Sequence, residues 1–269
     1  MKKNILIAVA VIIVLAGGIA AYLYWQDNQS KPETVQQVPP PAPPSLPAQE
    51  PAAKEAIEAL PEQPVLPKLS ESDKFMLDTM ADLVGDKSLM KLFYTKWIIR
   101  KIVATIDNLP RKRVSPNVMP VKRAPGKFIT KGPEEGKTIS PKNATRYAAY
   151  MKIAEMADPQ KLVEVYVRLY PLFQQAYEEL GYPKKYFNDR LLTVLDHLLD
   201  APDLKEPVAL VQPNVFYLYA KESLEARSAG QKILMRIGSA NEAKIKSRLS
   251  GIKQQIMLHM RDQKIDRNK

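Results

Sequence analysis

The stretch from Ile5 to Trp25 contains 21 residues without a charged side chain. At about 1.5 Å of rise per residue, a helix of that length is roughly 31 Å long, which matches a hydrocarbon core of about 30 Å. Lys2 and Lys3 precede the stretch, and aromatic residues close it, as is typical of a span with a cytoplasmic start. We therefore predict a cytoplasmic N-terminus (1–4) and a single-pass transmembrane anchor (5–25).

Two alternatives remain for this segment. Gly18-Ile19-Ala20 would suit cleavage of a signal peptide, but the apolar run is longer than a usual signal-peptide core and its aromatic residues follow the cut. An uncleaved anchor is therefore favoured, and both interpretations export the rest of the chain. A cytoplasmic C-terminal domain is the third interpretation, although only Lys31 follows closely enough to oppose Lys2 and Lys3.

The next segment changes character. Eleven of the 42 residues from Gln26 to Pro67 are proline, and the others are mainly Gln, Ala, Glu and Val. Such a composition cannot bury enough apolar surface to offset the entropy of ordering the chain. We predict a disordered, semi-extended Pro-rich linker over residues 26–68, which would hold the following domain away from the membrane.

The remaining chain carries mostly helical signals, and we predict a mainly α fold: a compact multi-helix domain over residues 69–260, followed by a charged tail (261–269). Two strand-like runs around Pro213-Asn214 allow at most one short β-hairpin. Caps, stop signals and apolar periodicity predict where the helices lie. The expected helices start at Ser70-x-x-Asp73, cover 89–109, start at Asp158-Pro159, run from Pro183 to Leu199, cover 222–237, and run from Ser239-x-x-Glu242 to about Met260.

Several phrases of this domain resemble a known family. They are Phe187-Asn188-Asp189-Arg190-Leu191, Leu195-Asp196-His197-Leu198-Leu199, Glu225 to Lys232, and Arg236-Ile237-Gly238. In these residues the chain resembles the bacterial domain-of-unknown-function family 3014, over residues 69 to about 258. The resemblance implies a proteobacterial inner-membrane protein with a periplasmic domain, and it brings no activity and no catalytic residues.

Positive charge is concentrated in one loop. Residues 110–142 hold nine Lys or Arg against two Glu, together with six Pro and three Gly, and are too long for an ordinary connector. The loop is either a solvated segment or a surface for an acidic partner, and a nucleic acid is not expected because Phe128 is its only stacking ring. The candidate partner- or polyanion-binding residues are Arg111, Lys112, Arg113, Lys122, Arg123 and Lys127.

Catalytic signals are weak. With two His and no Cys in the chain, we predict no metal site and no cofactor. His197 is expected to be a hydrogen-bonded histidine of a buried helix rather than the base of a triad. Glu222-Ser223 faintly echoes the lytic transglycosylase pattern, whose chemistry needs a Glu protonated in an apolar site. Glu222 is therefore the one candidate catalytic residue, and the question of an enzyme stays open.

A second candidate site lies where polar residues and a glycine occur in what is expected to be a mid-helix position. Glycine there is unfavourable unless something approaches closely, so Arg227, Gly230 and Gln231 are candidates for ligand approach.

The predicted function is a non-catalytic binding or scaffolding module of the cell envelope, with an envelope protein or an acidic cell-wall or lipid component as partner. The alternatives are a peptidoglycan-cleaving enzyme using Glu222 and a polyanion- or lipid-binding module.

Overall fold

The computed structural model describes residues 66–156, 158–205 and 207–266, and this part of the chain is mainly helical, as predicted. Its α-helices are α2 (Ser72–Val84), α3 (Ile98–Asn108), α4 (Asn143–Arg146), α5 (Ala148–Met156), α6 (Pro159–Glu179), α7 (Phe187–Leu199), α8 (Glu222–Glu225), α9 (Ala229–Arg236) and α10 (Ser239–Asp266). Short 3₁₀ helices are η1 (Leu69–Glu71), η2 (Lys87–Leu92) and η3 (Pro116–Val118).

The predicted anchor (5–25) and nearly all of the predicted linker (26–68) lie outside the described residues. Among the helices within residues 66–156, 158–205 and 207–266, none has both the length and the apolar character needed to cross a bilayer.

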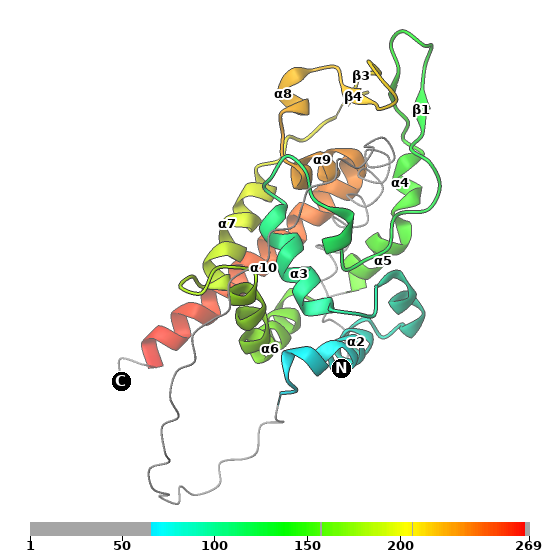
Figure 1. Ribbon diagram of the computed structural model, residues 1–269. Helices are drawn as coiled ribbons and strands as arrows, with labels where there is room; N and C mark the ends of the chain where they lie inside the picture. The colour runs from blue at the N-terminus through cyan, green and yellow to red at the C-terminus, as the bar shows by residue number, and fades with distance from the viewer. Residues whose placement is uncertain (1–65, 157, 206, 267–269) are drawn as a thin grey trace, which may run out of the picture.

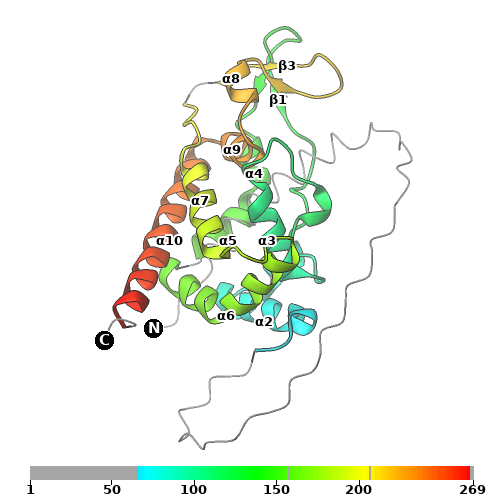
Figure 2. The same cartoon turned by 60° about the vertical axis from the view of Figure 1, so that its left-hand side comes forward.

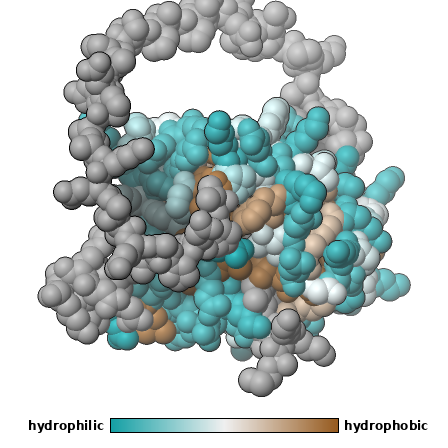
Figure 3. Space-filling view, turned by 90° about the horizontal axis from the view of Figure 1, so that it is seen from below, coloured by the Kyte–Doolittle hydropathy of each residue, from teal (hydrophilic) through white to brown (hydrophobic). Residues whose placement is uncertain are grey.

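The core lies between four helices. α10 packs along both α6 and α7, and α3 packs against α6 (Figures 1 and 2). Each helix contributes one apolar stripe, and the residues that are fully or almost fully buried include Ile98, Ile102, Leu169, Phe187 and Ile252. Seen from below, the surface is mostly hydrophilic with separate hydrophobic patches (Figure 3).

The helix predicted over 89–109 is interrupted, so that prediction is wrong in part. η2 ends at Leu92, Phe93 forms an antiparallel bridge with Val121, and α3 begins only at Ile98. Asp73 explains where α3 starts. It was predicted to cap its own helix, but its two carboxylate oxygens accept the backbone N–H groups of Trp97 and Ile98, each at 2.8 Å. A side chain from another helix therefore caps α3.

The helix predicted over 222–237 is also two helices. Ser228 has an extended backbone (φ −65°, ψ 163°), and its hydroxyl accepts the N–H of Gln231, so it is the N-cap of α9. In contrast, Asp158 caps α6 as predicted, with Oδ1 accepting the N–H groups of Gln160 (2.8 Å) and Lys161 (3.4 Å). Local cap signals thus located the start of α6 but not the break before α9.

Two short hairpins lie beside the helical body, where at most one was predicted. The expected one pairs β3 (Leu210–Val211) with β4 (Leu218–Tyr219) in antiparallel register. The other pairs β1 (Thr130–Lys131) with β2 (Thr138–Ile139), inside the basic loop, and a bridge from Thr138 to Ala209 connects the two hairpins. The labels β1 and β3 lie at the same end of the molecule in both views (Figures 1 and 2).

Near the start of α10, a carboxylate is buried beside a lysine. The Glu242 residue is 1% exposed, and Nζ of Lys246 lies 3.2 Å from its Oε1. Lys246 also donates to the carbonyl of Ala201 and, at 2.8 Å, to Asp203. Burial raises the pKa of Glu242 to about 7, and Lys246 opposes this rise. The folded state therefore holds the proton more tightly than the unfolded chain.

This raised pKa predicts a loss of stability as the pH rises from about 4.5 to above 7. The contribution of the protonated Glu242 is complete below the unfolded value of 4.5 and is lost as the pH rises through about 7. We expect Glu242→Gln to raise the free energy of unfolding by about 1 kcal/mol at pH 8 and to change it little at pH 4, as measured by urea denaturation. Glu155→Gln, at an exposed carboxylate paired with Lys244, is the matched control. A gain that does not depend on pH would contradict the assignment.

Candidate functional site: the polar cleft around Asp107

An open polar cleft of about 420 Å³ lies between the C-terminal end of α3, the α6–α7 connection and the first turns of α7. Its lining combines charged side chains with tyrosines. The residues that line it are Asp107, Tyr177, Tyr182, Lys184, Lys185, Tyr186, Asp189, Arg190 and Thr193.

Asp107 forms the floor of this cleft, and its side chain is only 3% exposed. Arg190 binds it twice, with Nε 2.9 Å from Oδ1 and one terminal nitrogen donating to the Asp107 carbonyl at 2.6 Å. Nη2 of Arg111 lies 3.0 Å from Oδ2, and the Tyr182 hydroxyl donates to the same oxygen at 3.3 Å. One buried carboxylate therefore pairs with two arginines. The combined positive charge of the two guanidinium groups exceeds the single negative charge of the carboxylate.

The short connection between α6 and α7 forms another wall of the cleft. Gly181 adopts φ 111°, a conformation that glycine tolerates, and it directs the chain away from α6. Tyr182 then stacks on Tyr177 with 4.6 Å between ring centroids, and Nζ of Lys185 lies 5.5 Å from the Tyr182 ring. Burial, followed by the negative charge of Asp107, raises the pKa of the Tyr177 hydroxyl, which therefore stays protonated at neutral pH.

The predicted basic loop connects this cleft to the other end of α3. Val118 accepts a hydrogen bond from Thr105 at 2.8 Å, and the N–H of Lys122 donates to Leu92 at 2.7 Å, so the loop runs back along α3. Its buried apolar residues, Val114, Met119, Val121 and Ala124, anchor it to the body. All six basic candidates are exposed: Arg111, Lys112, Arg113, Lys122, Arg123 and Lys127. Of these, Arg111 contacts Asp107, which lines the cleft.

At Gly230 the close approach comes from the chain itself. A Cβ atom there would lie 2.6 Å from Cδ2 of Leu198 and 3.1 Å from the Leu109 carbonyl. The N–H of Gly230 donates to that carbonyl at 3.0 Å, and Ala229 donates to Arg111 O at 2.8 Å. The N-terminus of α9 thus satisfies carbonyls that follow α3. Protein atoms fill the space that a ligand would need at this glycine.

The two neighbours of Gly230 in the predicted site also contact other parts of the protein. Gln231 donates through Nε2 to the His197 carbonyl at 2.9 Å, and a terminal nitrogen of Arg227 lies 4.0 Å from Asp200. Nε2 of His197 lies 2.8 Å from Oγ of Ser228, and burial lowers the His197 pKa. Because the Ser228 hydroxyl already caps α9 and is buried, this pair connects α7 to α9. The hydrogen-bonded histidine was predicted, while its partner was not.

Glu222, the candidate catalytic residue, is exposed at the start of α8. The surroundings that would keep a carboxyl protonated are apolar, and an exposed side chain lacks them. Glu225, one turn later, forms an ion pair with the buried Lys232 and accepts the N–H of Tyr219 at 3.1 Å. Within the described residues, no group of three or more His, Cys, Asp or Glu side chains is arranged to bind a metal ion.

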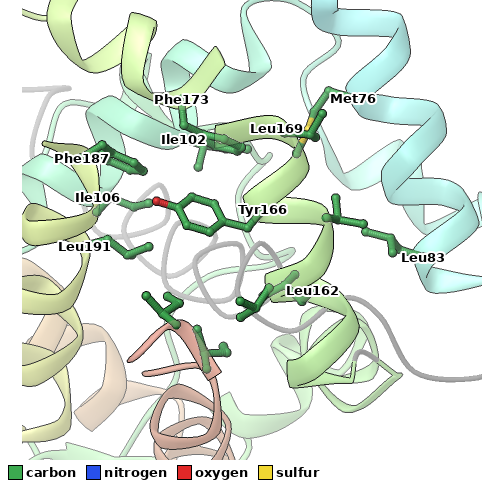
Figure 4. A pocket seen from close by; sticks show the side chains of 14 residues that line it. Met76, Leu83, Ile102, Ile106, Leu162, Tyr166, Leu169, Phe173, Phe187 and Leu191 are labelled. Atoms are coloured by element: carbon green, nitrogen blue, oxygen red, sulfur yellow. The ribbon is translucent and has the colours of Figure 1, made fainter. Parts of the chain in front are cut away.

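A second cavity lies inside the helical core, where the Tyr166 ring is surrounded by apolar side chains (Figure 4). Its volume is about 30 Å³, and the Tyr166 hydroxyl is engaged with Asn188 at 2.5 Å. A void that small and that apolar stays dry and has no room for a ligand. It is therefore a packing void of the core, and Tyr166, Tyr147 and Tyr150 are core residues rather than ligand platforms.

The sequence did not identify the floor of the cleft. Asp107 stands among apolar residues of the predicted 89–109 helix, and Arg190 lies in one of the phrases that resemble the family. A lone carboxylate within an apolar stripe is a signal for a buried ion pair, because such a group needs a partner. The sequence carries that signal at Asp107, but it does not indicate which cation forms the ion pair with it.

A family model described as a protein of unknown function (DUF3014) matches residues 98–253, more than half of the chain. The matched segment begins at the first residue of α3 and ends within α10, so it contains Asp107, Arg111 and Arg190 of the cleft. Comparison with the curated proteins and with the solved structures found no match in either set. The match over these residues establishes that the chain belongs to the DUF3014 family.

Proposed function

We propose that this protein is a non-catalytic binding module of the bacterial cell envelope. Residues 5–25 would anchor it in the inner membrane, residues 26–68 would act as a stalk, and the helical domain would face the periplasm. Its binding site would be the cleft around Asp107, and its partner an acidic component of the cell wall.

The charge of the cleft is the observation that carries this proposal. The cleft is lined by three cations, Lys184, Lys185 and Arg190, and by two carboxylates, Asp107 and Asp189, and Arg111 pairs with Asp107 from beside it. The Asp107 oxygens are already occupied by the two arginines. In the part of the chain that the structure describes, neither lysine forms an ion pair, and both are exposed at the rim. An anionic group entering the cleft therefore meets positive charge that is not yet compensated.

The tyrosines favour a ligand that also carries sugar rings. Tyr182 is half-buried and stacks on the buried Tyr177 ring, so the ring available to a sugar is that of Tyr186, which is 68% exposed at the edge of the cleft. Aromatic faces accept the C–H surface of a sugar, while hydroxyl groups and cations bind its polar edges. Peptidoglycan combines both features, since its glycan strands bear peptides with carboxylates. Lys112 and Arg113, which follow Arg111, would extend the basic surface toward such a polymer.

The test is co-sedimentation of the purified full-length protein with isolated sacculi. We expect Lys184→Ala/Lys185→Ala to weaken binding about tenfold, because two uncompensated cations are removed from the rim. Binding should also weaken as salt is added. Lys205→Ala/Lys221→Ala removes two exposed lysines that line a different hollow and should bind as the wild type does. Equal binding by both double variants would refute the assignment of the cleft.

A further inference from the structure

A second exposed surface lies at the other end of α3, between η2 and α3. The four residues Tyr94, Thr95, Lys96 and Trp97 are all exposed, and the exposed fractions of the two aromatic residues are 41% for Tyr94 and 64% for Trp97. Indole is a large apolar group, so leaving it in water forgoes the stabilisation that burial would bring. Core packing therefore does not explain why a tryptophan stands here.

The backbone at Trp97 is held in an unfavourable conformation. Its φ is 58° and its ψ is 38°, and among the described residues it is the one non-glycine residue with positive φ. Side chains with a Cβ atom rarely adopt this left-handed conformation. The carboxylate of Asp73 maintains it by accepting the N–H groups of Trp97 and Ile98. An unfavourable backbone that is fixed from another helix and presents an exposed ring is typical of a functional surface.

Lysines surround the two rings. Nζ of Lys101 lies 4.5 Å from the centroid of the Tyr94 ring, and Lys96 precedes Trp97. Lys91 is exposed at the end of η2, and the exposed Lys122 lies beside it because its N–H donates to Leu92. Of the ion pairs in the described residues, none involves these four lysines. The Asp73 carboxylate, which accepts the N–H groups of Trp97 and Ile98, is close enough for its charge to act on Lys101 but forms no ion pair with it.

We propose that this Trp97 face, defined as Tyr94 and Trp97 with Lys91, Lys96, Lys101 and Lys122, rests on an anionic lipid surface. Tryptophan and tyrosine rings prefer the level of the headgroups, where an apolar body and a polar edge are both satisfied. Lysines near a bilayer attract acidic headgroups. The four cations are all lysines, which act as point charges on flexible stems, and this suits a fluid array of phosphates better than a fixed bidentate partner.

This surface is distinct from the Asp107 cleft. α3 has 11 residues and is therefore roughly 16 Å long, with Trp97 before its first residue and Asp107 at its other end. The two surfaces can therefore fail or succeed separately. The predicted linker sets only the largest distance between the domain and the bilayer, so it also permits the domain to return to the surface. The proposed anchor at residues 5–25 would raise the effective concentration of the domain there.

The experiment measures the fluorescence of Trp97. The chain has two tryptophans, so Trp25→Phe leaves Trp97 as the single fluorophore in the full-length protein. The variant is added to vesicles of phosphatidylcholine alone or mixed with phosphatidylglycerol, with brominated acyl chains as quenchers. We expect quenching of Trp97 in the mixed vesicles at low salt, and reduced quenching in phosphatidylcholine alone or when salt is added.

Two further variants identify the groups responsible. Lys96→Glu/Lys122→Glu, built into the Trp25→Phe chain, should lose most of the quenching, while Lys205→Glu/Lys221→Glu should retain it. Far-UV circular dichroism checks that each variant is folded. Unquenched Trp97 in the mixed vesicles overturns the proposal, and so does equal quenching in the two lipid compositions. Sacculus binding through Lys184 and Lys185 is measured separately and does not depend on either result.

Discussion

Replacing Asp107 with alanine is expected to lower the free energy of unfolding by about 3 kcal/mol or more. Asp107 is the shared acceptor of Arg190 and Arg111, and removing it leaves a partly buried guanidinium without its counter-charge. Breaking a buried pair from one side typically costs about 3 to 5 kcal/mol. We expect the lower end of that range, because the Arg190 side chain is 26% exposed and water can reach it through the cleft. Urea denaturation measures the difference.

The matched control for Asp107 is another aspartate that is paired at the i,i+4 spacing. Asp78 pairs with Lys74, and the two side chains are 60% and 88% exposed. Asp78→Ala should therefore change stability by about 0.5 kcal/mol or less. Asp107→Asn keeps the shape but removes the charge, and it should fall between the alanine variant and the wild type. If Asp107→Ala and Asp78→Ala were equally stable, Asp107 would not be the electrostatic anchor of the cleft.

The second large effect is expected at Gly230. Alanine there would place its Cβ 2.6 Å from Leu198 Cδ2 and 3.1 Å from the backbone oxygen of Leu109. The leucine methyl can move aside, but the carbonyl is fixed because it accepts the Gly230 N–H. Overpacking of this kind costs about 1 to 3 kcal/mol, which outweighs the better helix propensity of alanine. Gly230→Ala should therefore lower the unfolding midpoint in urea.

Gly251, inside α10, is the matched glycine. A Cβ there would meet only the Pro159 ring, at 3.3 and 3.5 Å, and no backbone atom. Gly251→Ala should therefore leave stability unchanged or raise it by up to about 1 kcal/mol, the propensity gain of alanine in a helix interior. The two substitutions are chemically identical and differ in what surrounds them. A loss of stability at Gly251 as large as that at Gly230 would argue against close packing as the cause.

Features that depend on neighbouring residues were predictable from the sequence. Asp158-Pro159 begins α6, Gly85 ends α2 and Gly181 ends α6, because caps act within one turn. The apolar face of α6 and the apolar residues of α3 and α7 likewise predicted the core, and the resemblance to DUF3014 is confirmed.

Features that depend on distant residues were not predictable. Asp73 decides where α3 starts from 24 residues earlier in the chain, so a continuous apolar pattern appeared to be one helix. Arg190 and Asp107 are 83 residues apart, so the candidate cleft does not appear in any local motif. The split between α8 and α9 was missed because the pairing of Ser228 with His197 and the docking of Gly230 on Leu109 are tertiary contacts.

The two ends of α3 are completed by segments far apart in the chain: Asp73 of α2 at the first turn, and the opening N–H groups of α9 just beyond the last. These contacts exist only when α2 and α9 have both docked on α3, so the two ends of α3 depend on segments that lie on opposite sides of it in the chain. Asp73 precedes the family match at residue 98. The folding unit is therefore longer than the segment that defines the family, and a fragment cut at that boundary would begin with an uncapped helix.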